Sequence, residues 1–193
     1  SDLESNPVTI MIGPPINPEL DPIVVDKLVQ SRGIKVVCGG TTSQIVSSHT
    51  GEQLTVTLNY ENPGIPPAAD IKGIDLVTEG VLTIGKTLDM LKRFPYMDRS
   101  EKVIALSKKD AASRLVRILL EESTEVRFLV GRAINPAHQN PEMPISLGLK
   151  LNLIKEMKAE LEKIGFEYKK NYAVSGYKKI NQLTQEELTK LFN

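Results

Sequence analysis

Two glycines followed by two threonines form the segment of this 193-residue chain best suited to contact a ligand. Gly39 and Gly40 let the backbone approach a bound molecule closely, and Thr41 and Thr42 carry hydroxyl donors. The segment follows an apolar run at 34–38 and opens a short helical pattern, so its N–H groups would attract an anion. It matches neither Gly-x-x-x-x-Gly-Lys nor Gly-x-Gly-x-x-Gly, and a tight turn with a threonine N-cap remains an open alternative.

A second candidate follows the most apolar run of the chain, residues 126–130. Asn135, His138, Gln139 and Asn140 bring amide and imidazole groups to this segment. A polar loop directly after a central strand is a favoured position for a site in α/β proteins. The structural alternative is a surface loop punctuated by prolines.

Two further residues next to these segments have chemically useful side chains. Glu79, beside Gly80, would bring a carboxylate to the same edge of the fold, although an acid at a helix start is also favoured by the helix dipole. Cys38 ends an apolar run where a nucleophile would sit, but a lone cysteine in such a run is more often a small buried side chain. His49 is expected to be structural.

Other classes of site and partner are disfavoured by composition and spacing. No His, Cys or carboxylate pair has recognisable metal-ligand spacing, and there is no Gly-x-Ser-x-Gly elbow. Lys plus Arg (24) equals Asp plus Glu (24), so the basic excess of a nucleic-acid-binding protein is missing. No apolar run approaches the ~20 residues that span a bilayer. The charge balance and the short apolar runs thus argue against nucleic-acid and membrane partners. The single cysteine and the lack of a signal-peptide pattern favour a cytoplasmic protein. No cofactor is indicated, and the initial serine is expected of a trimmed or partial chain.

The elements that would position these residues alternate between strand and helix patterns. The alternation predicts an α/β fold, with a mostly parallel sheet, helices on both faces and a Rossmann-like three-layer architecture. Strands ending near Ile12, Cys38, Val77 and Val130 are expected in one sheet with their carboxyl ends at one edge. Ligands bind at that edge in open α/β sheets. Four loops would form it: 13–17, 39–42, 78–80 and 131–140.

Helix ends and domain limits follow from capping residues and apolar periodicity. We expect five helices in residues 1–174. The first is capped by Asp21 and ended by Gly33, the second is closed by Gly51, and the third starts near Val81 and is stopped by Pro95. The fourth is capped by Asp110, and the fifth spans 145–164 before Gly165. A start near Asp75 for the third of these helices stays open. Further strands are expected at 53–58, 103–106 and 166–174. Residues 1–174 would form the α/β domain, and 175–193 an extension with a short helix capped at Thr184.

Three segments together resemble a known family. They are Lys35–Val46 (KVVCGGTTSQIV), Gly73–Ile84 (GIDLVTEGVLTI) and Phe128–Pro141 (FLVGRAINPAHQNP). In this order they resemble the C-terminal region of bacterial serine/threonine phosphatases of the stage II sporulation protein E type, which opens with a segment like Thr9–Pro15. The resemblance covers roughly residues 8 to 172 and coincides with the loops that the expected topology places at one edge.

The resemblance implies a regulatory or small-ligand-binding domain whose partner is a metal-dependent phosphatase domain in the same parent chain. That catalytic domain holds its metals with aspartates, some in Asp-Gly pairs, whereas the eight aspartates here are scattered and none precedes glycine. This chain alone is therefore expected to show no manganese- or magnesium-dependent hydrolysis of a phosphopeptide, which an assay with and without chelator would check. Two alternatives stay open: an enzyme using Glu79 or His138 as acid or base on a small polar or phosphorylated metabolite, and a protein-interaction module.

Overall fold

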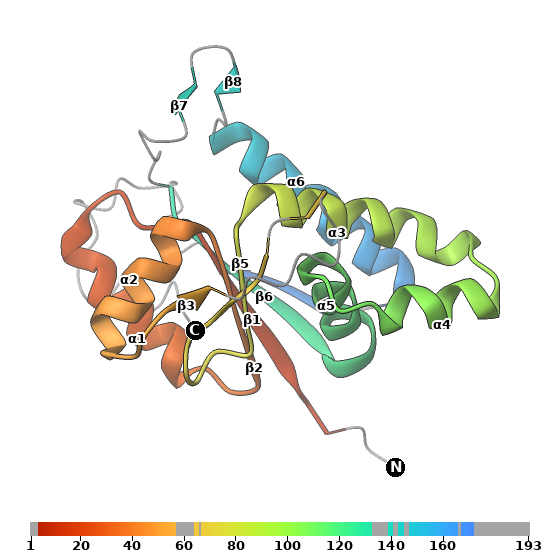
Figure 1. Cartoon of the computed structure of the whole chain (residues 1–193), viewed down its shortest axis with the longest axis horizontal. Coiled ribbons are helices and arrows are strands. Elements are labelled where there is room, and N and C mark those ends of the chain that lie inside the picture. Colours follow the sequence, from red (N-terminus) through yellow and green to blue (C-terminus); the bar gives the residue numbers. More distant parts are fainter. Residues whose placement is uncertain are drawn as a thin grey trace.

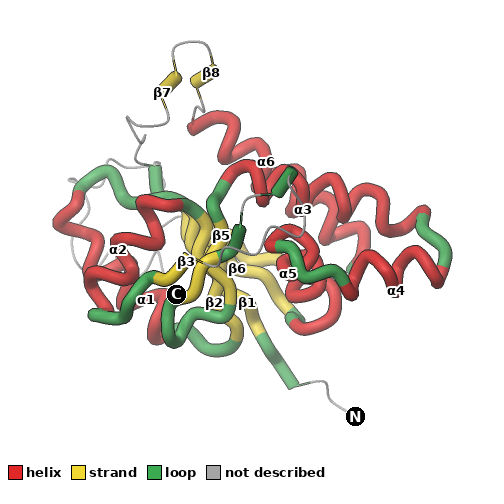
Figure 2. Tube along the Cα trace, in the orientation of Figure 1, coloured by secondary structure: helices red, strands yellow, loops and turns green. Residues whose placement is uncertain are grey.

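A central sheet lies between two layers of helices in the computed structural model of the chain (Figure 1). The structure describes residues 4–56, 64–65, 67–132, 139–140, 143–144, 147–165 and 167–171. Figure 2 shows the strands in the middle and helices on both sides of them. The architecture is the Rossmann-like three-layer α/β arrangement that the sequence predicts.

Seven strands form the sheet in the order β3-β4-β5-β2-β1-β6-β9. Five of them, β5, β2, β1, β6 and β9, are parallel neighbours, while β4 pairs antiparallel with both β3 and β5. The sheet is therefore mostly parallel, as predicted. Its strands span Pro7–Ile12 (β1), Ile34–Cys38 (β2), Thr55–Val56 (β3), Ala69–Asp70 (β4), Leu76–Thr78 (β5), Glu125–Val130 (β6) and Glu167–Asn171 (β9).

The two faces of the sheet are covered by different helices. On one face pack α1 (Asp21–Gln30) and α2 (Gly40–Thr50), against buried strand residues such as Met11 and Val37. On the other pack α3 (Val81–Arg93), α5 (Ala111–Arg117) and α6 (Leu147–Ile164), against residues such as Ile10 and Phe128. Successive residues of a strand point to opposite faces of the sheet. Because helices cover both faces, the inner strands are continuous apolar runs in the sequence.

The chain changes direction across the sheet between β1 and β6. From β1 it proceeds through α1, β2 and α2 toward β5, along the face that α1 and α2 cover. From β5 it returns through α3 and α5 to β6 on the far side of β1, and continues through α6 to β9. Loops that leave β1 and β6 at their carboxyl ends thus lead to opposite faces, and this position is the topological switch point of the fold.

Two helix boundaries differ from the sequence prediction. Asp21 was expected to cap α1, but it is the first helical residue and Leu20 is the N-cap, because the 3₁₀ turn η1 (Pro18–Leu20) leads into the helix. That turn has its own cap, since Glu19 N–H donates to Asn17 Oδ1 at 3.0 Å. Ser31, not Gly33, is the C-cap of α1. The other caps are confirmed: Gly51 closes α2 with φ of 73°, and Asp110 accepts from Ser113 N–H at 2.9 Å.

The predicted strand at 103–106 is wrong, because these residues lie in α4 (Arg99–Ser107). The side chain of Asp98 caps this helix by accepting from Glu101 N–H at 2.9 Å. Val103 and Ile104, which suggested a strand, are 64% and 59% exposed on the helix surface. Local capping therefore prevails over an apolar run that has no neighbouring strand to pair with.

The alternative start of α3 near Asp75 is also wrong, since α3 begins at Val81 and residues 76–78 form β5. The Asp75 carboxylate accepts the N–H of Lys35 at 2.8 Å, at the entrance of β2. A side chain that pairs with a neighbouring strand in this way fixes the segment as sheet. The short strand β4 was not predicted, because it lies within a segment rich in proline and glycine.

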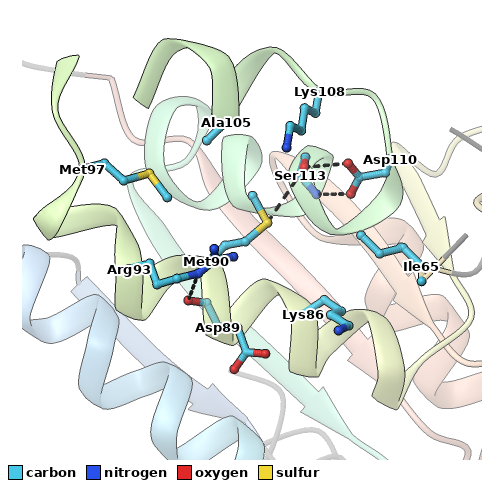
Figure 3. A pocket seen from close by; sticks show the side chains of 11 residues that line it. Ile65, Lys86, Asp89, Met90, Arg93, Met97, Ala105, Lys108, Asp110 and Ser113 are labelled. Atoms are coloured by element: carbon cyan, nitrogen blue, oxygen red, sulfur yellow. Dashed lines mark hydrogen bonds between the residues drawn. The ribbon is translucent and has the colours of Figure 1, made fainter. Parts of the chain in front are cut away.

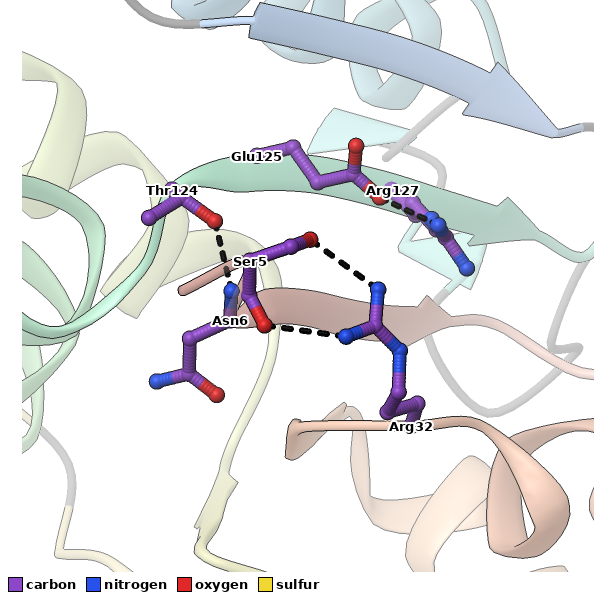
Figure 4. A network of polar contacts seen from close by, with 6 residues as sticks. All are labelled: Ser5, Asn6, Arg32, Thr124, Glu125 and Arg127. Carbon is purple, nitrogen blue, oxygen red and sulfur yellow. Dashed lines mark hydrogen bonds and ion pairs between the residues drawn. The ribbon is translucent and has the colours of Figure 1, made fainter. Parts of the chain in front are cut away.

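Polar side chains tie the start of β1 to its two neighbours at the opposite, amino-terminal edge of the sheet (Figure 4). Arg32 donates to both the carbonyl and the hydroxyl oxygen of Ser5 at 3.0 Å. The N–H of Asn6 donates to Thr124 Oγ1 at 2.7 Å. The side chains at this edge are used in holding strands together, which leaves the carboxyl edge as the place for a ligand.

The C-terminal part of the domain follows the prediction as far as it is described. Ile154, Met157 and Leu161 of α6 are fully buried, and β9 lies within the strand predicted at 166–174. The predicted extension at 175–193, with its helix at Thr184, lies outside the described residues. Among the described helices none has both the length and the apolar character needed to cross a membrane.

Candidate functional site

The carboxyl ends of four adjacent parallel strands are aligned at one edge of the sheet. Ile12 at the end of β1 is in register with both Cys38 of β2 and Val130 of β6, and Cys38 is in register with Thr78 of β5. Adjacent strands are ~4.8 Å apart, so residues that follow β2 and β5 are near neighbours. We call the loops that follow these four strands the rim. The prediction that the four strand ends meet at one edge is confirmed.

Two glycines of the rim, one after β2 and one after β5, bring their backbones into contact. Gly39 has φ of 120° and Gly80 has φ of 135°, conformations that side chains of L residues rarely adopt. A Cβ atom on Gly80 would lie 3.2 Å from the Cα of Gly39. Gly39 N–H also donates to the carbonyl of Thr78 at 3.0 Å, which extends the β2–β5 pairing beyond the strands. A side chain at Gly80 would therefore force the two loops apart.

Each of these glycines is the N-cap of a helix, so two helix N-termini begin side by side. The first intrahelical bonds are Ser43 N–H to Gly39 O at 2.9 Å in α2 and Ile84 N–H to Gly80 O at 3.0 Å in α3. The N–H groups of the preceding turn residues have no acceptor within their own helix. By contrast, α4 and α5 start away from the rim with aspartate side chains as caps. Paired N-termini without a side chain at the N-cap favour negative charge at this part of the rim.

The residues of the predicted glycine–threonine segment differ in exposure. Gly40 is exposed, and a Cβ added to it would meet no atom within 4 Å. Thr41 is half-buried, whereas Thr42 is buried at 1% exposure. A Cβ on Gly39 would lie 3.0 Å from Thr42 Oγ1, so that hydroxyl is turned back over the N-cap. Thr41 is accordingly the threonine better placed for a ligand.

Glu79 and Cys38 lie together behind the paired N-termini. Burial raises the pKa of the Cys38 thiol to about 12, an interaction with the Thr78 hydroxyl opposes this, and the charge of Glu79 raises it further. Cys38 is 1% exposed. A thiol with so high a pKa stays protonated at neutral pH, which supports the structural interpretation over a nucleophile. The half-buried Glu79 lies close to Gly39 through its neighbour Gly80, as the rim hypothesis requires.

The second predicted segment is only partly described. Asn135 and His138 lie outside the described residues, so their convergence with Thr41 stays a prediction. Gln139 and Asn140 form β7, which pairs antiparallel with β8 (Met143–Pro144) in a separate small sheet. In Figure 1 this hairpin extends beyond the start of α6. His49, expected to be structural, is exposed near the end of α2.

At the topological switch point two more glycines hold the loops after β1 and β6 against each other. Gly131 N–H donates to the carbonyl of Ile12 at 2.7 Å. A Cβ on Gly131 would overlap with the carbonyl oxygens of Gly13 and Pro14. Gly13 itself has φ of 80° and is buried. The loops after β1 and β6 are therefore in direct backbone contact at the switch point.

A cationic side chain, that of Lys150, lies at this contact between the two loops, and sequence reasoning missed it. Lys150 in the first turns of α6 donates from Nζ to Gly131 O at 3.2 Å, and the same Nζ lies directly against Gly13. Burial lowers the pKa of this ammonium group. Arg132 follows Gly131, and its Nε is buried with no hydrogen-bond partner in the described part of the chain. The sequence analysis did not single out Lys150, because only the register of α6 against the sheet reveals its position.

Comparison with known protein families, curated proteins and solved structures finds no match to this chain. The assignment of a site therefore rests on the geometry of the rim. Across the residues that the structure describes, no three His, Cys, Asp or Glu side chains are grouped so as to hold a metal ion.

A separate cavity of about 270 Å³ lies between α3, α4 and α5, outside the rim (Figure 3). Lys86, Arg93 and Lys108 bring positive charge to it, and Met90 and Met97 supply apolar surface. Asp89 and Asp110 are its acidic residues, and Asp110 already caps α5 and accepts from the Ser113 hydroxyl at 2.8 Å. None of the rim glycines lines this cavity. It is an indentation of the helical layer rather than the site that the sheet topology points to.

Proposed function

We propose that this chain is a ligand-binding domain that takes a small polar or anionic molecule at the carboxyl rim of its sheet. The observation that carries the proposal is the contact between Gly39 and Gly80, which sets the N-termini of α2 and α3 side by side. Backbone donors at two helix starts act together on one negative group without any basic side chain. This explains how a chain of zero net charge would bind an anion.

The resemblance of the rim segments to the C-terminal region of stage II sporulation protein E-type phosphatases gives this binding a proposed purpose. In that setting the domain would be regulatory: ligand binding would modulate a phosphatase domain in the same parent chain. Lys35–Val46, Gly73–Ile84 and the start of Phe128–Pro141 contain Gly39, Gly80 and Gly131, the three glycines whose contacts build the rim. The segments that carry the resemblance are thus the segments that form the candidate site.

Gly40→Val is expected to abolish binding of any ligand found in a thermal-shift screen of nucleotides and phosphorylated metabolites. A ligand present at 100 times its dissociation constant would stabilise the wild-type chain by about 2.7 kcal/mol. Valine at this exposed helix start would block access to the N–H groups of α2, yet the fold has space for it because nothing lies within 4 Å of an added Cβ. The measurement is the ligand-induced shift in melting temperature.

Gly85→Ala is the matched control, since it also adds a Cβ to a helical glycine with open space around it, but within α3 and beyond its first turn. This variant should keep the full ligand-induced shift. An unchanged shift in Gly40→Val would contradict the rim site. A screen without any stabilising ligand would instead favour the interaction module, for which the exposed side chains of Tyr96, Val103 and Ile104 around α4 are the candidate surface.

A further inference from the structure

We propose that Lys150, together with Arg132, binds the carboxylate or phosphate group of the ligand at the topological switch point. This rests on the proposed function and deepens it, because it names the charged group that the rim ligand must carry. Lys150 lies outside all four loops from which the site was first predicted, and Arg132 lies in the loop 131–140 but was not among its candidate residues.

The first argument is the position of the ammonium group. In this fold class ligands occupy the crevice where the loops after two neighbouring strands part to opposite faces, here β1 and β6. Nζ of Lys150 lies directly against Gly13 and 3.2 Å from Gly131 O, the two glycines at which the loops after β1 and β6 meet. An ammonium group has three donor protons, and Gly131 O accepts one of them. The described residues supply no second acceptor for this group, so two donor protons remain for the oxygen atoms of an anion.

The second argument is the environment of the two cations. Burial lowers the pKa of Lys150, so its charge is held at a cost in the free protein. Arg132 adds a second positive charge one residue beyond Gly131, and its buried Nε makes no hydrogen bond within the described residues. An anion bound at Lys150 would offset the cost of holding that charge, and one that also reached Arg132 would provide its guanidinium group with an acceptor.

The third argument is the spacing along the rim. β1 lies between β2 and β6, so Gly39, which follows β2, is about two strand spacings, or ~10 Å, from Gly131, which follows β6. One molecule of metabolite size covers that span. Its anionic group would lie at Lys150 and Arg132, and a second polar or negative group at the paired N-termini of α2 and α3. A compound with two such groups, for example a phosphorylated metabolite with a carboxylate, fits this arrangement.

The test uses inorganic phosphate as the probe and follows backbone amide resonances of the ¹⁵N-labelled chain at constant ionic strength. In the wild-type chain, phosphate should shift the resonances of Gly131, Arg132 and their neighbours in a saturable manner. Lys150→Met and Arg132→Gln should each weaken this binding by about tenfold or more, as expected for a lost charge-assisted hydrogen bond. Lys150→Arg should retain it. Lys155→Met, which removes an exposed cation from the same helix, is the control and should leave phosphate binding unchanged.

Each of three outcomes would overturn the inference, and each can be told apart from a failure of the proposed function. If phosphate binds Lys150→Met as tightly as it binds the wild-type chain, Lys150 serves only in the packing of the two loops. Equal weakening by Lys155→Met would reduce the effect to overall charge. Finally, the wild-type chain could fail to bind phosphate and yet bind a neutral compound, with Gly40→Val abolishing that binding. This outcome would support the rim site and contradict the anion subsite.

Discussion

Replacing Gly131 with alanine is expected to lower the free energy of unfolding by about 3 kcal/mol or more. The added Cβ would overlap with the carbonyl oxygens of Gly13 and Pro14, which are backbone atoms and cannot rotate away. Relief requires the ends of β1 and β6 to separate, which would break the 2.7 Å bond from Gly131 N–H to Ile12 O. For a chain of this length the loss corresponds to a melting temperature lower by roughly 6 to 12 °C.

The control for this prediction is Gly40→Ala, in which a Cβ is added to a rim glycine with open space around it. Its stability should stay within about 0.5 kcal/mol of wild type, as for most exposed substitutions. Urea unfolding followed by circular dichroism measures both variants. Equal stabilities of Gly131→Ala and Gly40→Ala would contradict the close backbone contact between the loops after β1 and β6.

The glycines of the rim therefore have two different roles, which the sequence does not distinguish. Gly13, Gly39, Gly80 and Gly131 are required because another loop's backbone or a neighbouring side chain occupies the space where a Cβ would be, and three of them also have positive φ. Gly40 has neither constraint, so its lack of a side chain is not explained by packing. An exposed, unstrained glycine at a helix start is what a site open to a ligand would need.

The layers of the fold were predictable because apolar runs, caps and glycine turns act locally and agree with one another. The runs ending at Ile12, Cys38 and Val130 become inner strands because both faces of each are covered, and this leaves the same continuous apolar pattern in the sequence. The apolar pair Val103–Ile104 misled because a short run without a pairing partner looks the same in a strand and on a helix surface. Pairing between distant segments decides such cases, and it is not visible in a local window.

The proposed site was predictable only where residues adjacent in sequence contribute to it. The segment at 39–42 and the pair Glu79–Gly80 each follow a strand, so the rule that ligands bind at carboxyl ends found them. Lys150 escaped because it is distant in sequence from Gly131 and reaches it only through the register of α6 on the sheet. The apolar stripe of α6 indicates which face of the helix is buried. It does not indicate which strand end lies next to the first turns of the helix.

Cys38 is expected to react with a thiol reagent at pH 8 about a thousandfold more slowly in the folded chain than in the unfolded chain. The thiolate is the reactive form, and the difference between a pKa of about 12 and the ordinary value of 9.0 reduces its population by about that factor. The measurement is the rate of colour development with a chromogenic disulfide, in buffer and in guanidinium chloride. Cys38→Ala, which should not react under either condition, is the control. Folded and unfolded rates within about a factor of ten of each other would reopen the nucleophile interpretation.

The same raised pKa makes the stability of the fold depend on alkaline pH, with a sign that follows from linkage. Below pH 9.0 the thiol is protonated in both states, so Cys38 contributes no pH dependence. Between pH 9.0 and about 12 the unfolded chain loses the proton while the folded chain keeps it, so stability falls by about 1.4 kcal/mol per pH unit from this group. Lys150, whose pKa is lowered, changes stability in the opposite direction as pH rises toward 10.5.

Urea unfolding of the wild-type chain and of Cys38→Ala at pH 8 and pH 10.5 separates the thiol contribution from the lysine contribution, since only the thiol contribution differs between the two proteins. Parallel pH profiles for the two proteins would show that the thiol behind the rim is in contact with solvent.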